Sequence, residues 1–380
     1  MNTMCSRSAV RVCLPMMMAL GLTGCGGSSQ NSISPPPPAK AEFLYATGQN
    51  QIFSFTVDPS TGALGAATAT PGPDTGILPG ATIAADPAAK FLFACDEQGH
   101  AVDVFSINAS TGSLTASGSP FPAEGLFPSG LAIDSTGNYL YVADVSAVGA
   151  FKVSRATGTL STVTGSPFAN SGVEYGLVAA PSTGFLYAAN PGIPQATISG
   201  FVIDPSSGIL TPVPGSPFTT VIGGTLNVAI HPSGKFFYAS GGSVDNIEGW
   251  VIDTANGALA TAISGSPFTL SGIGGDISSL VIDPAGKFLY ASTSGGIFGF
   301  AIDDNNGALT PITGSPFSVF GFGHLVIDPS GQFMYLGFGL FITGMNIDSS
   351  TGMLTALSGS PFATGAPLDV FPTLAIVKAP

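Results

Sequence analysis

Acidic residues and histidines gather in the irregular stretches of this sequence, between its apolar runs. The chain has 22 acidic residues and three histidines. A carboxylate can act as a general base that removes a proton from water, and an imidazole can exchange protons in the same reaction. Together they would support hydrolysis. The candidates for this chemistry are Asp144, Glu174, Asp276, His100 and His324.

A second set of polar side chains could hold a ligand through hydrogen bonds. It comprises Asp96, Glu97, Asn190, Asn227 and Glu248. Loops of variable length often carry binding residues, but ordinary loops that only face solvent are polar as well. Both interpretations stay open for each of these residues.

Motifs of several other active sites are missing from the sequence. We find no Gly-x-Ser-x-Gly, His-Glu-x-x-His or Gly-x-Gly-x-x-Gly motif, no phosphate-binding loop, and no Cys/His spacing of a metal site. The acidic stretch 303–307 lacks the alternating acids and the distal Glu of a calcium-binding loop. We therefore predict no metal and no cofactor.

The elements that must position these side chains form a repeating unit, seen most clearly from Leu280 to Phe317. An apolar run leads into the turn 283–287, and a second turn closes at Gly307. Asp bonds its own backbone in such turns, Pro fixes φ, and Gly accepts a positive φ. The unit therefore predicts four strands: A up to 282, B at 288–292, C at 297–302, and D from 309 toward 317.

The unit occurs seven times. An aromatic residue of strand B recurs at intervals of about 45 to 52 residues, at Tyr45, Phe93, Tyr141, Tyr187, Tyr238, Tyr290 and Tyr335. Four-stranded repeats of this length are typical of a β-propeller. The first unit lacks strand A, which the stretch 372–377 supplies. We predict an all-β, seven-bladed β-propeller with four antiparallel strands per blade, closed by pairing of the C-terminal strand with the N-terminal blade.

Strand order distributes the connections between two faces of the propeller. The A–B and C–D turns are regular, whereas the B–C and D–A loops vary in length and carry the candidate residues. Four positions before each A–B turn, a small or polar residue would ring the mouth of the central channel. These collar residues are Thr82, Gly130, Gly176, Asn227, Ser279, His324 and Thr373.

The N-terminal residues have the pattern of an export signal. Arg7 and Arg11 accompany an apolar run from 12 to 22 that is too short to span a bilayer. The run ends in Leu22-Thr23-Gly24-Cys25, which resembles the lipobox of bacterial lipoproteins and implies diacylation of Cys25. We therefore predict a signal peptide at 1–24, a lipidated Cys25 with a Gly/Ser/Pro tether at 25–41, and the propeller at 42–380.

Lipid on Cys25 would make the membrane a partner and would anchor an exported protein to the bacterial cell envelope. In a Gram-negative cell we expect the outer membrane, because Gly26 rather than Asp follows Cys25. The alternative is an ordinary signal peptide with a cysteine near its cleavage site by chance. The formal net charge of −13 argues against nucleic acid as a partner.

The repeats resemble a known family. Tyr141-Val142-Ala143-Asp144, Tyr187-Ala188-Ala189-Asn190, the Asp-Pro-Ser-Gly turns and the Thr-Gly-x-Leu-Thr hairpins are similar to seven-bladed lactonase-type propellers and to YVTN repeats. The resemblance covers 43–378. It implies relatives that open or close lactone rings with polar and cationic side chains at the channel mouth. The B–C and D–A loops of this chain contain no Lys or Arg.

Two functions remain open from the sequence. We predict first a lipid-anchored module of the cell envelope that binds an unknown small molecule or envelope protein. The alternative is a lactonase-family hydrolase for an uncharged lactone, and less readily for a phosphorylated sugar lactone. One of Asp144, Glu174 and Asp276 would then be the general base, with His324 or His100 as its partner.

Overall fold

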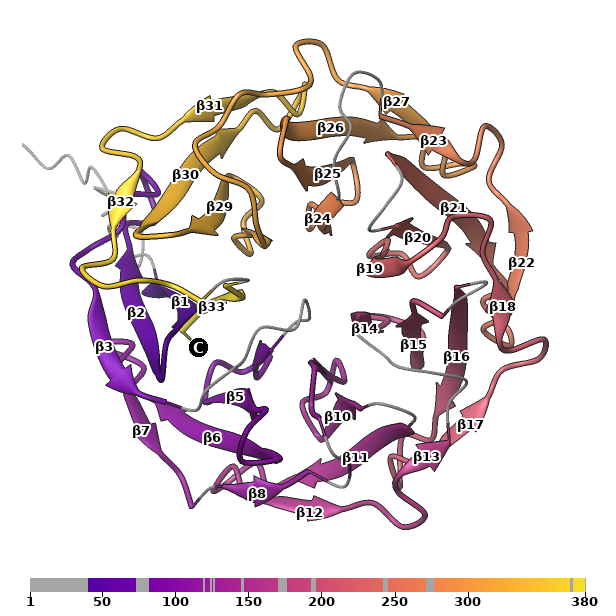
Figure 1. Cartoon of the computed structure of the whole chain (residues 1–380), viewed down its shortest axis with the longest axis horizontal. Coiled ribbons are helices and arrows are strands. Elements are labelled where there is room, and N and C mark those ends of the chain that lie inside the picture. The colour runs from indigo at the N-terminus through magenta and orange to yellow at the C-terminus, as the bar shows by residue number, and fades with distance from the viewer. Residues whose placement is uncertain are drawn as a thin grey trace, which may run out of the picture. The chain divides into compact units, whose positions relative to one another are not determined.

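The computed structural model describes residues 40–72, 82–118, 120–123, 125, 127–144, 147–169, 176–192, 196–241, 245–270, 277–369 and 372–379. Every regular element in these ranges is a β-strand. The strands form seven sheets arranged around a common axis, as Figure 1 shows. The predicted all-β, seven-bladed propeller is therefore confirmed. No helix within the described ranges is long and apolar enough to cross a membrane.

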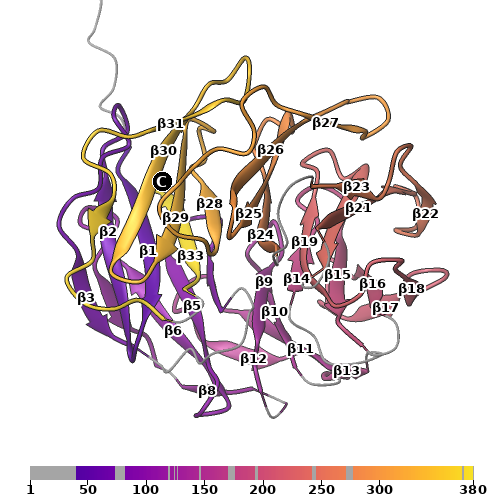
Figure 2. The ribbon, with the colours of Figure 1, turned by 45° about the horizontal axis from the view of Figure 1, so that its top comes forward.

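Each sheet repeats the predicted order A, B, C, D from the axis outward (Figures 1 and 2). The A strands of blades 1 to 7 are β33 (Leu374–Lys378), β4 (Ile83–Ala85), β9 (Gly130–Ile133), β14 (Gly176–Ala179), β19 (Thr225–Ile230), β24 (Ile277–Ile282) and β28 (Leu325–Ile327). The B strands are β1 (Glu42–Gly48), β5 (Phe91–Asp96), β10 (Tyr139–Ala143), β15 (Phe185–Asn190), β20 (Phe236–Gly241), β25 (Phe288–Thr293) and β29 (Phe333–Phe338).

The two outer strands follow the same blade order. The C strands are β2 (Gln51–Val57), β6 (Ala101–Ile107), β11 (Ala147–Val153), β16 (Thr197–Ile203), β21 (Asn246–Ile252), β26 (Gly296–Ile302) and β30 (Phe341–Ile347). The D strands are β3 (Thr68–Pro71), β7 (Leu114–Ala116), β12 (Leu160–Thr162), β17 (Leu210–Pro212), β22 (Leu259–Ala262), β27 (Leu309–Pro311) and β31 (Leu354–Ala356).

Strand D differs from the prediction because it breaks in two. Strand β27 ends at Pro311, and Phe317 pairs separately with Ile297 of strand C. Between them, the Ser315 hydroxyl accepts a hydrogen bond at 3.0 Å from the Gly299 N–H. The hydroxyl thus satisfies a strand-C donor that strand D leaves unpaired. In five other blades the second piece is a two-residue strand: β8 (Phe121–Pro122), β13 (Phe168–Ala169), β18 (Phe218–Thr219), β23 (Phe268–Thr269) and β32 (Phe362–Ala363).

The ring closes as predicted, because β33 pairs antiparallel with β1. Glu42 lies opposite Lys378 in this pairing, and the Lys378 Nζ is 2.7 Å from a buried Glu42 Oε1. No strand edge is left open at the seam. We call the face with the A–B and C–D turns the turn face, and the face with the B–C and D–A loops the loop face. Strand β1 begins and β33 ends on the turn face.

The predicted turn chemistry is present. Asp283 Oδ1 accepts a hydrogen bond from the Phe288 N–H at 2.6 Å, and Asp328 Oδ1 accepts one from the Phe333 N–H at 2.7 Å. His231 replaces the turn Asp in blade 5. Its Nε2 is 2.8 Å from the Gly286 carbonyl oxygen of the next blade, so His231 has a structural contact.

A buried tyrosine of strand B links most blades to the next. The Tyr238 hydroxyl donates to the Gly307 carbonyl at 2.7 Å, and a Cβ on Gly307 would meet the Phe236 ring at 2.7 Å. Gly307 also has a φ of +75°. Glycine is therefore favoured at this position both by the positive φ and by the lack of space for a Cβ. Equivalent bonds of 2.7 to 3.1 Å join Tyr45 to Gly112, Tyr141 to Gly208, Tyr187 to Gly257, Tyr290 to Gly352 and Tyr335 to Gly62.

The seam between blades 2 and 3 is different, because Phe93 stands where the other blades have the tyrosine. Here Arg155, in the C–D turn of blade 3, forms an ion pair with the buried Asp86 of blade 2. Arg155 also donates to the Gly137 carbonyl at 2.9 Å. An ion pair thus joins the two blades that lack the tyrosine bond.

We expect Tyr238→Phe to lower the free energy of unfolding by about 1–3 kcal/mol, because it leaves the buried Gly307 carbonyl without a donor. Urea denaturation of the full-length protein measures this. The matched control is Tyr139→Phe, whose hydroxyl bonds Ser206 at 2.7 Å in a less buried position, where water can replace it. Equal losses in the two variants would contradict the role of Tyr238.

Candidate functional site

The predicted collar residues lie at the loop-face ends of the A strands and make hydrogen bonds from blade to blade. The Thr82 and Thr373 hydroxyl oxygens are 3.0 Å apart. The Ser279 hydroxyl accepts from the Leu325 N–H at 3.0 Å. Much of the collar's polar character therefore serves contacts between neighbouring blades, which the sequence did not reveal.

His324 is the collar residue that can exchange protons. The Leu374 N–H of blade 1 points at its Nδ1 across 3.5 Å, a contact that favours the neutral tautomer with its proton on Nε2. The side chain is partly exposed. Desolvation by the surrounding protein lowers the pKa of His324 from 6.5 to about 4. The imidazole is therefore neutral at pH 7, and Nε2–H can donate to an oxygen that gains negative charge.

Blade 6 fixes the backbone that carries His324. The Gly323 N–H donates to the Ser292 hydroxyl at 3.2 Å, and the Ser278 hydroxyl donates to the Gly323 carbonyl at 3.3 Å. A Cβ on Gly323 would lie 2.5 Å from the Gly337 carbonyl oxygen, so only glycine permits this approach. The imidazole is thus presented by a backbone held from two blades.

Asp144 lies on blade 3, where it holds a loop. It is buried, and its Oδ2 accepts from the Phe127 N–H at 3.2 Å. The cavity beside it measures about 10 Å³, which is room for about one water molecule and not for a lactone ring. This geometry gives Asp144 a structural contact, and its catalytic role stays a prediction.

Phe127 also brings His100 close to Asp144. The exposed His100 has a φ of +50°, and its ring meets the Phe127 ring edge-on at 5.6 Å between centroids. The structure therefore gathers His100 and Asp144 on blades 2 and 3, whereas His324 lies on blade 7. The other candidate acids, Glu174 and Asp276, lie outside the described residues.

The predicted ligand-binding residues are spread over blades 2, 4 and 5. Glu97 is partly exposed in the same turn as Asp96, and burial raises the pKa of Glu248. The others and Glu248 bond the protein itself: Asp96 with the Gly99 N–H at 2.7 Å, Asn190 with the Ser199 hydroxyl at 3.1 Å, Asn227 with the Ile277 carbonyl at 2.8 Å, and Glu248 with the Val221 N–H at 2.9 Å. Their binding role stays a prediction.

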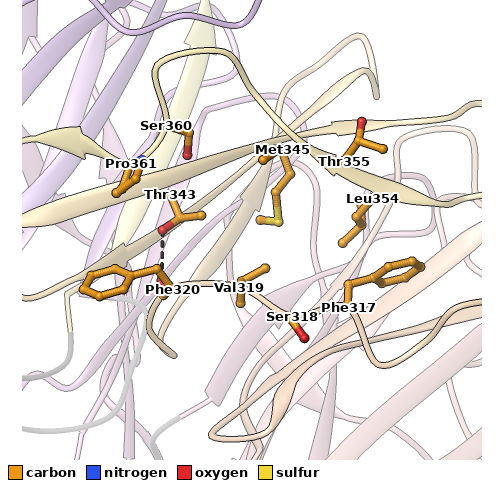
Figure 3. A pocket seen from close by; sticks show the side chains of 11 residues that line it. Phe317, Ser318, Val319, Phe320, Thr343, Met345, Leu354, Thr355, Ser360 and Pro361 are labelled. Atoms are coloured by element: carbon orange, nitrogen blue, oxygen red, sulfur yellow. Dashed lines mark hydrogen bonds between the residues drawn. The ribbon is translucent and has the colours of Figure 1, made fainter.

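The sequence analysis missed a group of aromatic rings near His324. Phe320 and Phe322 are 54% and 42% exposed. The Phe338 ring lies 6.2 Å from the Phe320 ring and 5.4 Å from the Phe322 ring. Phe320 also borders a pocket of about 180 Å³ (Figure 3). Three phenylalanines between 317 and 322, in a loop, were the signal that could have revealed this region.

The basic residues of the propeller all lie on one of its two faces. Of nine basic residues, Arg7 and Arg11 precede the described ranges. The other seven lie in A–B or C–D turns or at strand ends on the turn face: Lys40, Lys90, Lys152, Arg155, Lys235, Lys287 and Lys378. The loop face therefore has no lysine or arginine to hold a phosphate. Within the described part of the chain, no group of three or more His, Cys, Asp or Glu side chains could hold a metal ion.

A model of the protein family described as "Lactonase, 7-bladed beta-propeller" matches residues 38–125 and 227–372. The chain belongs to this lactonase family. No sequence among curated proteins matches it.

Similar solved structures share the lactonase-family fold at low identity. Putative 6-phosphogluconolactonases from Bacteroides uniformis and Bacteroides fragilis are 20% and 19% identical, with TM-scores of 0.69 and 0.70. The alignments cover 88% and 91% of this chain and 99% and 100% of theirs. A periplasmic gluconolactonase from Pseudomonas aeruginosa is 18% identical with a TM-score of 0.65, over 90% of this chain and 100% of its own.

Family membership corrects the first functional prediction. We predicted a binding module and kept the lactonase-type hydrolase as the alternative. The match to the lactonase family favours the hydrolase. The residues that carry the resemblance are structural turns and strands, which enzymes and non-enzymes of this group share. They indicate the fold but not the activity, so the sequence analysis favoured the wrong function.

We expect His324 to titrate near pH 4. Its pKa is lower in the folded than in the unfolded chain, so the unfolded state binds more protons between about pH 6.5 and pH 4. The contribution of His324 to stability is therefore complete above pH 6.5 and is lost as the pH falls toward 4. NMR titration of the imidazole measures the pKa, and His324→Asn identifies the signal. A midpoint near pH 6.5 would contradict the desolvated environment.

Proposed function

We propose that this chain is a lactonase-type hydrolase that opens an uncharged lactone on the loop face, beside His324. Membership of the lactonase family is the observation that carries the proposal. The Pseudomonas structure named as a gluconolactonase adds support, since gluconolactone is an uncharged ring. The neutral imidazole at pH 7 is suited to such a substrate.

The distribution of charge favours an uncharged lactone over a phosphorylated one. A phosphate group is usually held by arginine or lysine side chains. All the basic residues of the propeller lie on the turn face. Acids such as Asp96 and Asp144 lie on the loop face, where they would repel an anionic substrate.

Hydrolysis of a lactone involves three changes that the protein can assist. Water attacks the lactone carbonyl carbon, the carbonyl oxygen gains negative charge, and the ring oxygen leaves with a proton. His324 Nε2–H would stabilise the negative oxygen by hydrogen bonding. A loop acid would accept the proton of the attacking water and return it to the ring oxygen as that oxygen leaves. Among the predicted acids, we select Asp276 for this test, because it directly precedes β24, whose neighbour β28 follows His324.

We expect saturable opening of glucono-δ-lactone above the spontaneous rate, and little or none of its 6-phosphate. Loss of one oxyanion donor typically lowers kcat by about 10²–10³-fold, so His324→Asn should have an effect of that size. Asp276→Asn should lower kcat as well. A pH-stat assay of the full-length protein measures both, with Lys287→Ala on the turn face as the control.

Either of two results would reject the catalytic proposal: turnover no faster than background on every lactone tested, or unchanged kcat in His324→Asn. Efficient turnover of the 6-phosphate would reject the argument from charge alone.

We also propose that the protein is exported and anchored to the cell envelope by lipid on Cys25. The supporting observation is the lipobox-like Leu22-Thr23-Gly24-Cys25 after a short apolar run. These residues, the predicted signal peptide at 1–24 and the tether up to 39 lie outside the described residues.

We expect Cys25→Ala to move the protein from the membrane fraction to the soluble fraction. Metabolic labelling with palmitate should be lost at the same time. Cys95→Ala is the matched control, because Cys95 is buried in the propeller and cannot carry a lipid there. Recovery of Cys25→Ala in the membrane pellet would contradict the anchor.

A further inference from the structure

We propose that the lactone opened beside His324 carries an apolar tail, which lies along the exposed rings of blade 7 and enters the pocket between blades 6 and 7. The inference rests on the hydrolase proposed above and names its substrate class. That class is an uncharged lactone with an alkyl or aryl substituent.

Blade 7 departs from the repeat at one position that lines the pocket. The fifth residue of strand C is a buried aromatic in the other six blades: Phe55, Phe105, Phe151, Phe201, Trp250 and Phe300. Blade 7 has Met345 instead, and Met345 lines the pocket. A thioether chain fills less width than an aromatic ring, and the pocket that Met345 lines measures about 180 Å³.

The lining of the pocket is suited to hydrocarbon. Phe317, Val319, Met345 and Leu354 supply apolar surface, as Figure 3 shows. An apolar cavity of about 150 Å³ in another protein stays dry and binds benzene. The space between blades 6 and 7 is therefore large enough for a phenyl ring or a short alkyl segment.

A run of aromatic rings leads from the pocket to Phe322. Phe320 forms one end of the pocket (Figure 3). From there the rings follow one another, with Phe338 at 6.2 Å from Phe320 and Phe322 at 5.4 Å from Phe338. Phe322 is two residues before His324 in the chain. A substrate with its ring at the imidazole can thus extend its tail along this path.

The backbone holds these rings where solvent reaches them. Gly321 separates Phe320 and Phe322, has a φ of +94°, and would place a Cβ 2.5 Å from Phe338. The Thr343 hydroxyl donates to the Phe320 carbonyl at 2.8 Å. Exposed apolar groups held in a defined arrangement mark binding surfaces more often than chance exposure does.

Charge decides what kind of tail fits. No lysine or arginine of the propeller lies on the loop face, so nothing basic would pair with an anionic tail. The lining of the pocket also offers no charged group, because none of its residues is ionisable. An uncharged hydrocarbon tail is therefore the occupant that both the lining and the surrounding face favour.

The test compares γ-butyrolactone, γ-octalactone and γ-dodecalactone as substrates. The full chain with Cys25→Ala is used, so that no detergent is needed. Each buried CH₂ contributes about fourfold in affinity, so we expect kcat/KM to rise at least about tenfold from the shortest to the longest lactone. Met345→Phe restores the ring that six blades have, and should remove most of that rise. Phe320→Ser should do the same.

Met353→Ser is the matched control. Met353 is also an exposed apolar residue of blade 7, 40% exposed, but it lies on the turn face. It should keep the dependence on tail length. Thermal unfolding of each variant shows that the propeller is intact, since Met345→Phe reproduces a packing that the other blades already use.

Binding of the neutral fluorophore N-phenyl-1-naphthylamine separates this inference from the proposed activity. Binding that is weakened at least fivefold by Met345→Phe and Phe320→Ser, with no lactone turnover, would support the apolar subsite and reject the hydrolase. If kcat/KM does not depend on tail length and fluorophore binding is unchanged in both variants, the apolar subsite would be rejected and the hydrolase would stand. Self-association that Phe320→Ser abolishes would assign the rings to a second copy and also overturn the subsite.

Discussion

The hydrogen bond from a buried tyrosine hydroxyl to a glycine carbonyl of the next blade sets how the sheets stand around the axis. Hydrophobic contact between blades is strong but non-directional. The bond from Tyr335 to Gly62 gives the seam between blades 7 and 1 a fixed point, and the glycine lies against the ring of Phe333. The contact between His324 and the Leu374 N–H crosses the same seam. The environment that keeps the imidazole neutral therefore depends on how these two blades are held.

The one seam without a tyrosine shows that the constraint can be met in another way. Phe93 offers no hydroxyl, and Arg155 instead joins Asp86 and the Gly137 carbonyl across blades 2 and 3. A charged hydrogen bond is stronger than a neutral one but is more exposed to salt. The ring therefore has six seams of one kind and one seam whose strength depends on ionic conditions. His100 and Asp144 belong to the two blades that this seam joins, but they lie on the loop face, whereas the ion pair lies on the turn face.

The sequence was sufficient to predict those features of the fold that depend on residues close together in the chain. The turn-forming roles of Asp283 and Gly307 involve only residues close to them in the chain, so their turns, and with them the strands and the blade count, could be predicted. The break in strand D could not be predicted, because Ser315 bonds Gly299, a residue of a different strand.

The aromatic rings that precede His324 were missed for a similar reason. Met345 stands out only when the strand-C positions of all seven blades are compared in register, and the pocket also needs the D–A loop of the preceding blade. The roles of Glu174, Asp276 and Cys25 fall on residues outside the described ranges and stay predictions.

The pairing of Glu42 with Lys378 puts both ends of the described chain together on the turn face. Both ends of the described chain therefore lie on the face opposite the proposed site. A support coupled to the propeller at residue 40 or 379 would therefore face the turns and lysines, and His324 with its neighbouring rings would face the bulk solution. A domain fused directly to either of these two positions would approach from the turn face, away from the proposed site.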